Sequence, residues 1–145
     1  MTDYRKMYEE KLTTADELAA RVESGWSIGM DTSATATPEI ISAIARRAAA
    51  GAVEGLTVQT MLDSYPFEFY ADDSLRGKMT GLSWFSSGGA RRAVNGGWAD
   101  IIPAYYRDIP KIIRANYEYD VVLLSVSPMD KHGYFSLATA SSYIE

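Results

Sequence analysis

Polar side chains follow a short apolar run near the end of the sequence. Residues 121–124 are Val-Val-Leu-Leu, and Ser125 and Ser127 come directly after them. His132, the only histidine, lies in the polar turn that follows. Such a run is typical of a strand buried in a parallel sheet, and groups just past the carboxyl ends of these strands face the ligand crevice. The two hydroxyls could therefore bind a ligand there, whereas the charged neighbours of His132 favour an ordinary surface turn.

A second group of hydroxyls lies in residues 29–38, GMDTSATATP, between a predicted strand and a predicted helix. Its members are Thr32, Ser33, Thr35 and Thr37. Hydroxyls and free backbone N–H groups at the start of a helix suit an anionic group such as a carboxylate or a phosphate. The alternative is a connecting loop whose threonines only cap the helix, and Thr37 stands at the cap position. The residues alone leave both interpretations open.

Signatures of other chemistries are missing from the sequence. It has neither G-x-x-x-x-G-K-[ST] nor G-x-G-x-x-G, and residues 81–85 lack the second glycine of a nucleophile elbow. There is no cysteine, which excludes disulfides, zinc–thiolate sites and a cysteine nucleophile. Asp130 and His132 would supply two metal ligands at most, so no metal site is expected. The paired glycines at 88–89 and 96–97 favour tight turns or helix ends over a phosphate cradle.

The composition is typical of one globular domain. Hydrophobic residues make up 47% of the 145 residues, which excludes disorder for the chain as a whole. The net charge of -5 argues against a nucleic-acid partner, and the arginine pairs at 46–47 and 91–92 fall in predicted helices, where they would form solvated faces. The start is charged, and no apolar run approaches the ~20 residues of a membrane helix. A cytoplasmic protein without a membrane partner is therefore expected.

Strand and helix signals alternate along the chain. A capping box, Thr14 with Glu17, opens a helix to about residue 23, and Pro38 opens a second helix with one apolar stripe. Two further helices are expected, one ending at residues 96–97 and a short one around 109–113. Strands are expected at residues 26–30, 56–62, 79–85 and 99–104 and from 121, with a re-entering strand at 134–137; residues 63–78 should be loop plus one helical turn. This order predicts an α/β fold with a mainly parallel sheet flanked by helices on both faces.

Five segments occur in the order of one known family. They are YEEKL at 8–12, the hydroxyl-rich 29–38, GARRAVNGGWADIIP at 89–103, YYRDIP at 105–110 and, most specific, SVSPMDKHGYFSL at 125–137. With them the chain resembles the acetyl-CoA hydrolase/transferase family, which contains the 4-hydroxybutyrate and butyrate:acetate CoA-transferases. The likeness runs over essentially the whole chain but covers only the amino-terminal part of a family member.

The resemblance implies an enzyme that moves CoA between a short-chain acyl-CoA and a carboxylate through a glutamyl-CoA intermediate. Coenzyme A would be a substrate, and no permanently bound cofactor is implied. None of the glutamates here stands in the family's catalytic motif, so the reactive glutamate is expected in a carboxyl-terminal domain outside this chain. Residues 1–145 are then expected to be a single truncated amino-terminal domain, inactive alone. Its incomplete sheet would be covered by a carboxyl-terminal half, a second chain or another copy in a homo-oligomer.

The resemblance also assigns substrate-binding roles, but no catalytic residue. The residues are Ser33, Thr35, Ser125, Ser127, Met129 and His132. Ser33 and Thr35 would donate hydrogen bonds in a loop that walls the acyl or carboxylate pocket. Ser125, Ser127 and Met129 would line the same crevice, with His132 as a donor at its rim.

Two other functions stay open on the sequence. One is a non-catalytic module that binds CoA or a small carboxylate in the 29–38 loop. The other is a structural or assembly subunit that binds neither. A sugar-phosphate isomerase-like enzyme is less well supported, because no poised acid–base pair is visible.

Overall fold

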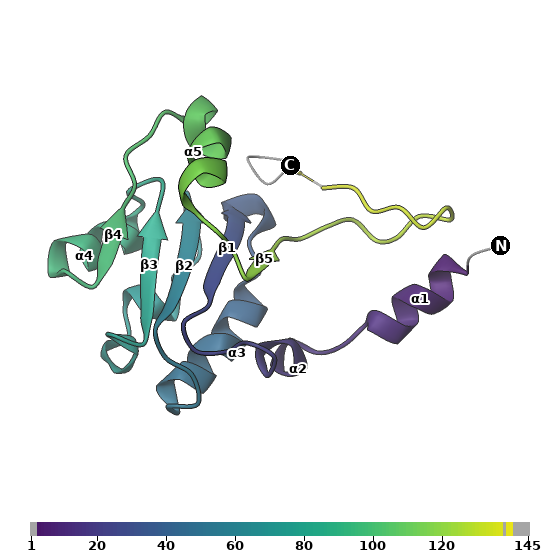
Figure 1. The fold of residues 1–145 in the computed structure, drawn as a ribbon, viewed down its shortest axis with the longest axis horizontal. Helices are drawn as coiled ribbons and strands as arrows, with labels where there is room; N and C mark the ends of the chain where they lie inside the picture. Colours follow the sequence, from purple (N-terminus) through teal and green to yellow (C-terminus); the bar gives the residue numbers. More distant parts are fainter. Residues whose placement is uncertain (1–2, 138, 141–145) are drawn as a thin grey trace.

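The computed structural model describes residues 3–137 and 139–140, and within them five parallel strands form one sheet (Figure 1). The strand order is β4-β3-β2-β1-β5. The strands are β1 (Ser27–Thr32), β2 (Leu56–Met61), β3 (Met79–Ser83), β4 (Ala99–Ile101) and β5 (Val121–Leu123). The expected parallel sheet is thus confirmed, with strand bounds that differ from those predicted by one to three residues at most ends.

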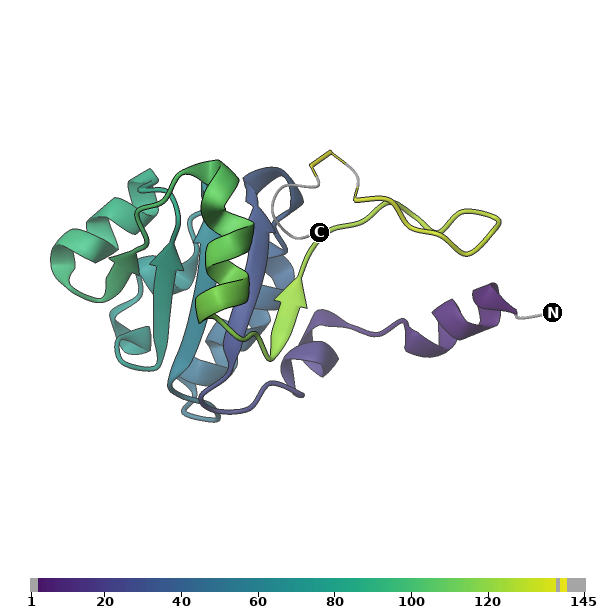
Figure 2. The ribbon, with the colours of Figure 1, turned by 45° about the horizontal axis from the view of Figure 1, so that its top comes forward.

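Helices cover both faces of the sheet, as predicted. The α-helices are α1 (Tyr4–Lys11), α2 (Ala15–Ala19), α3 (Pro38–Ala49), α4 (Gly88–Gly96) and α5 (Ile109–Asn116). Helix α5 lies in front of the sheet and α3 behind it (Figure 2). Of the described residues, no helix combines the length and the apolar character that a membrane crossing needs.

The main core lies between the sheet and α3. Ile28 and Met30 of β1 are fully buried there, two residues apart, as the alternation of side chains along a strand requires. The predicted stripe of α3 is buried against them: Ile41, Ile44, Ala45 and Ala48 are at most 3% exposed. A smaller apolar cluster under α5 contains Met61, Trp84 and Ile109.

The segment between β2 and β3 contributes more to the core than expected. Instead of one helical turn it holds two 3₁₀ turns, η2 (Glu68–Tyr70) and η3 (Asp73–Leu75). Four of its large apolar side chains are almost fully buried: Phe67, Phe69, Tyr70 and Leu75. Little periodicity is visible in this sequence because the residues are buried by tertiary contacts, not by one face of a regular element.

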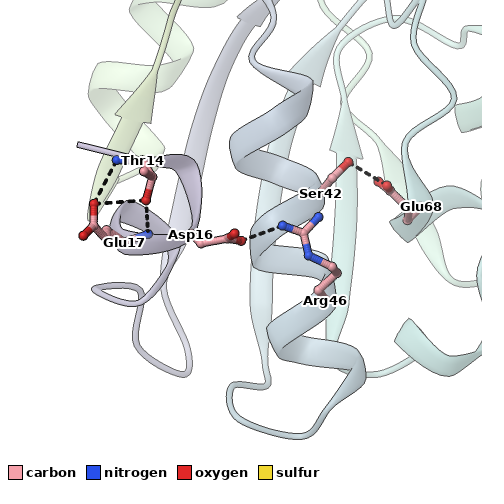
Figure 3. Close-up of polar contacts among 6 residues, drawn as sticks. All are labelled: Thr14, Asp16, Glu17, Ser42, Arg46 and Glu68. Carbon is pink, nitrogen blue, oxygen red and sulfur yellow. Dashed lines mark hydrogen bonds and ion pairs between the residues drawn. The ribbon is translucent and has the colours of Figure 1, made fainter. Parts of the chain in front are cut away.

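The capping box at the start of α2 is confirmed (Figure 3). The Glu17 N–H donates to the Thr14 hydroxyl at 3.2 Å, and the Thr14 N–H donates to the Glu17 carboxylate at 3.0 Å. Hydrogen bonds from the Thr13 hydroxyl and from Thr14 lower the pKa of Glu17 to about 2. The helix ends at Ala19, four residues earlier than predicted.

The arginine pair at 46–47 lies in a helix, as predicted, but forms a solvated face only in part, because Arg46 is exposed and Arg47 is half-buried. Arg46 makes an ion pair with Asp16, and Arg47 donates to the carbonyl oxygens of Ala19 and Val22 (Figure 3 shows the ion pair). Both arginines therefore join α2 to α3. On the same helix Ser42 donates to Glu68 of η2 at 2.6 Å.

Helix α1 and residues 124–137, here called the arm, extend away from the sheet beside each other (Figures 1 and 2). The arm doubles back on itself through backbone hydrogen bonds from Ser127 to Ser136 and from Asp130 to Tyr134, each 2.9 Å. The predicted strand at 134–137 is not formed in this described part of the chain; the residues belong to the arm. Tyr8 of α1 packs on Phe135 with ring centroids 5.8 Å apart.

Candidate functional site

The strand order places a topological switch point between β1 and β5. The chain passes from β1 through β2 and β3 to β4 in one direction, and then returns to form β5 on the other side of β1. In open parallel sheets, ligands bind beyond the carboxyl ends of the two strands at such a point. The loop after β1 and the segment after β5 are therefore the first places to look for a site.

These two segments are in contact. The Ser125 N–H donates to the Thr35 carbonyl oxygen at 3.0 Å, and the Ser125 hydroxyl donates to the Ala36 carbonyl oxygen at 3.2 Å. Thr35 belongs to a 3₁₀ turn, η1 (Ser33–Thr35), that joins β1 to α3. The structure thus brings Ser33, Thr35 and Ser125, three of the predicted residues, to one edge of the sheet.

A buried carboxylate holds this loop in place through hydrogen bonds. Asp31 at the end of β1 is 1% exposed; it accepts a hydrogen bond from the Thr35 hydroxyl at 2.6 Å and one from the Thr32 N–H at 2.7 Å. Thr35 is equally buried, so its hydroxyl is used inside the protein. Ser33 is only half-buried. Of the two predicted donors in this loop, Ser33 is thus the better placed to reach a ligand.

The expected cap by Thr37 is not made. Thr37 does occupy the N-cap position of α3 and Pro38 the first helical position, as predicted, but the Thr37 side chain makes no capping hydrogen bond. Its hydroxyl oxygen is buried without a hydrogen-bond partner. The backbone at Thr37 has φ −119° and ψ 68°, outside the extended region usual for a cap residue, which explains why the hydroxyl does not reach the helix N–H groups.

A second polar cluster lies at the carboxyl end of β2. The Thr60 hydroxyl donates to the Asp63 carboxylate at 2.7 Å, and the Tyr70 hydroxyl donates to the same oxygen at 3.1 Å. Burial raises the pKa of the Asp63 carboxyl, although the two hydroxyl donors oppose this. Burial, together with the nearby Asp63 charge, also raises the pKa of the Tyr70 hydroxyl.

The remaining three predicted residues lie farther along the arm than Ser125. Met129 and His132 line a groove of about 980 Å³ between the arm and α1, whose other wall includes Tyr4 and Tyr8. The Ser127 hydroxyl holds the arm together, because it accepts from the Ser136 N–H at 2.9 Å. These residues are not brought to the edge that carries Ser33 and Ser125, and their substrate-binding role stays a prediction.

The turn that carries His132 is built around Asp130. The Asp130 carboxylate accepts hydrogen bonds from the backbone N–H groups of Tyr134 and His132, at 2.9 and 2.8 Å, and these bonds lower the pKa of its carboxyl. Asp130 is therefore engaged by its own turn. In the described part of the chain, no three His, Cys, Asp or Glu side chains are grouped so that they could hold a metal ion.

Sequence reasoning missed Asp31 and Asp63. Each follows an apolar segment that forms a buried strand, so the available signal was an acidic residue at a strand's carboxyl end. Neither belongs to a known motif, and their hydroxyl partners become neighbours only through folding.

A family model described as the acetyl-CoA hydrolase/transferase N-terminal domain matches residues 1–144. The succinyl-CoA:cyclohexane-1-carboxylate CoA transferase of Geobacter metallireducens is 33% identical over 140 residues, which are 97% of this chain and 31% of that protein. The butyryl-CoA:acetate CoA-transferase of Anaerostipes caccae is 28% identical over 142 residues, again 97% of this chain and 31% of that protein.

Solved structures agree in fold. RipA from Yersinia pestis superimposes with a TM-score of 0.87 at 27% identity, covering 99% of this chain and 35% of that chain. A 4-hydroxybutyrate CoA-transferase from Porphyromonas gingivalis has the same fold, with a TM-score of 0.66 at 17% identity over 97% of this chain and 31% of that one. The chain thus spans about a third of the length of the relatives that it matches.

Proposed function

Because the chain belongs to the acetyl-CoA hydrolase/transferase family, whose N-terminal domain it matches, we propose that it is the amino-terminal scaffold of a CoA-transferase. The substrates are a short-chain acyl-CoA and a carboxylate. The remaining two thirds of the enzyme, which the relatives have in addition, supply the reactive glutamate. Coenzyme A acts as a substrate and is not permanently bound.

One observation carries this proposal: the hydrogen bonds from Ser125 to Thr35 and Ala36 at the switch point. They fix the 33–37 loop at the carboxyl ends of β1 and β5, directly before the start of α3. A helix start offers free N–H groups and a partial positive charge, both of which favour a carboxylate. The loop is therefore suited to hold the carboxylate substrate while the chemistry occurs on a group from outside the chain.

The proposed reaction needs no acid or base from this chain. The external glutamate carboxylate attacks the thioester carbonyl, which forms a mixed anhydride and releases CoA as a thiolate. The thiolate then attacks the glutamyl carbonyl of the anhydride, which gives a glutamyl-CoA thioester and frees the first carboxylate. A second carboxylate attacks this thioester and takes CoA by the same two steps in reverse.

We expect the 145-residue chain alone to exchange no CoA between acetyl-CoA and butyrate. A chimera, in which residues 1–145 are joined to the carboxyl-terminal two thirds of the Geobacter transferase, should exchange it. The measurement is the formation of butyryl-CoA, followed by chromatography. Turnover by the chain alone would show that the nucleophile lies within it. A folded but inactive chimera, with tight binding of butyrate by the chain, would instead favour a non-catalytic binding module.

Replacing Ser33 by alanine in the chimera should raise the KM for the carboxylate about tenfold and leave kcat nearly unchanged, because one hydrogen bond to a charged group is lost in both the ground and transition states. Ser33→Thr, which keeps the hydroxyl, is the matched control and should keep a KM near that of the parent. An unchanged carboxylate KM in Ser33→Ala would remove Ser33 from the site.

A further inference from the structure

The two edge strands of the sheet differ in chemistry. The strand order places β4 at one edge and β5 at the other. Strand β4 carries Asp100 in its middle, and a charged residue protects an edge strand from pairing with another strand. Strand β5 consists of Val121, Val122 and Leu123, and its register with β1 runs without a bulge. The β5 edge therefore lacks the features that usually protect an edge strand.

The backbone of β5 has hydrogen-bonding groups that point away from the sheet. The Asp120 N–H donates to the Ser27 carbonyl oxygen at 2.9 Å, so the backbone groups of Asp120 face β1. Because these groups alternate in direction along a strand, those of Val122 also face β1, and those of Val121 and Leu123 face outward. Among the described residues β5 pairs with β1 alone. Its outer edge can therefore accept a further strand.

Apolar side chains are exposed on the same side of the molecule. Val122 is 38% exposed and Val126, at the start of the arm, 44%. Helix α1 and the arm project past β5 (Figures 1 and 2), and Tyr4 and Tyr8 line the groove between them. Tyr4 is 52% exposed, and α1 has no buried residue. Apolar surface at the edge strand and along both projections indicates a docking surface.

The shape of this side favours a segment of the same enzyme over a second copy of the chain. Because α1 and the arm project past β5, the sheet of a second copy would have to fit between them to reach the edge (Figures 1 and 2). The match to RipA covers 99% of this chain, so it includes α1 and the arm, but only 35% of the longer RipA chain. The arrangement thus occurs in a protein that has further chain available to cover it.

We propose that the outer edge of β5 is the docking surface for the carboxyl-terminal part of the enzyme, which adds a strand to the sheet. Main-chain hydrogen bonds to Val121 and Leu123 hold the added strand, and apolar contacts with Val122 and Tyr4 cover it. The inference goes beyond the proposed function, because it concerns how the sheet is completed. None of its tests depends on turnover.

Hydrogen–deuterium exchange tests the added strand directly. The 145-residue chain is compared with the chimera described above, by mass spectrometry of residues 120–124. The amide hydrogens of Val121 and Leu123 should exchange at least about tenfold more slowly in the chimera, because they become hydrogen-bonded. Strand β4, at the other edge, is the internal control and should show a smaller change.

Two results of this experiment would contradict the inference. One is equal exchange of residues 120–124 in the 145-residue chain and in the chimera. The other is protection of these residues in the 145-residue chain itself, together with a dimer in sedimentation, which would show that a second copy covers the edge. A folded chimera with a protected β5 but no turnover would count against the proposed function and leave the inference intact.

Val122→Lys tests the docking surface by placing a charge where the inference requires apolar contact. In the chimera it should speed exchange of residues 120–124 at least about tenfold, back towards the rate in the 145-residue chain. In the 145-residue chain it should leave the thermal unfolding midpoint nearly unchanged, because the side chain is partly exposed there. Ile101→Lys is the matched control: Ile101 is 40% exposed in β4, and its substitution should not affect residues 120–124. Equal effects of the two substitutions would rule out β5 as the docking edge.

If the chimera does not fold, the intact Geobacter transferase is used in its place. The strand of that enzyme that aligns with β5 should be protected from exchange at the positions of both Val121 and Leu123. Rapid exchange at these two positions in the folded enzyme would overturn the inference.

Discussion

Asp31→Ala should lower the free energy of unfolding by about 2 to 3 kcal/mol, because one buried and one partly buried hydrogen bond to the carboxyl group are lost. The Thr35 hydroxyl and the Thr32 N–H both donate to this carboxylate, and Asp31 and Thr35 are each 1% exposed. Removing the carboxylate leaves the buried Thr35 hydroxyl with only its longer bond, 3.2 Å, to the Thr32 carbonyl oxygen. Urea unfolding followed by tryptophan fluorescence measures the loss.

Two further variants show whether the loss comes from the buried network. Asp31→Asn keeps one accepting oxygen and should recover part of the stability. Asp100→Ala changes an exposed aspartate in strand β4 and should stay within about 0.5 kcal/mol of the parent. A loss below about 1 kcal/mol in Asp31→Ala would mean that this carboxylate does not organise the loop.

The same substitution should also weaken the candidate site. Thr35 is bonded on one side to Asp31 through its hydroxyl and on the other to Ser125 through its carbonyl oxygen. When the hydrogen bond from Thr35 to Asp31 is lost, the η1 turn gains conformational freedom. The hydrogen bond from Ser125 to the Thr35 carbonyl oxygen then becomes less favourable. In the chimera, Asp31→Ala should therefore raise the KM for the carboxylate substrate, even at temperatures at which the variant is folded.

Gly81→Ala should destabilise the protein by about 3 kcal/mol, since overpacking a tightly filled core costs about that much. A Cβ at this position of β3 would lie 2.4 Å from Tyr70 Cε1 and 2.9 Å from Phe69 Cε2. Both rings are almost fully buried, so neither can move away without displacing others. Thermal unfolding followed by circular dichroism measures the effect.

Gly88→Ala is the matched control, because a Cβ there would meet nothing within 4 Å. Gly88 is the first residue of α4, where alanine should be neutral or stabilising by up to about 1 kcal/mol. If the thermal unfolding midpoint of Gly81→Ala equalled that of Gly88→Ala, Gly81 would not be tightly packed against Tyr70 and Phe69. Displacement of Tyr70 should also disturb its bonds to Thr60 and Asp63.

Local patterns in the sequence predicted the regular part of this fold. The apolar stripe of α3 and the capping box of Thr14 and Glu17 are short-range features, and both are present as expected. The alternation of strands and helices predicted the parallel sheet. The resemblance to the family, carried by five short segments, is confirmed by the match to its N-terminal domain.

Elements without a buried face could not be predicted in this way. Helix α1 has no buried residue and is supported by an Asp3 cap and exposed ion pairs such as Arg5 with Glu9. Surface pairs of this kind add little free energy, and they leave no apolar period in the sequence. Residues 134–137 of the arm were mistaken for a strand because the apolar residue Phe135 packs on α1 and not on the sheet.

Local sequence patterns thus determined the fold class, helices α2 to α5 and the family resemblance, because hydrophobic period, caps and turn residues act over a few positions. The assembly of the site was decided by tertiary structure. Strand β5 pairs with β1 and not with β4, and this pairing alone brings Ser125 to Ala36, 89 residues away in sequence. The burial of Asp31 has the same origin: it is set by contacts between distant segments, whose free energy exists only when the whole sheet has formed.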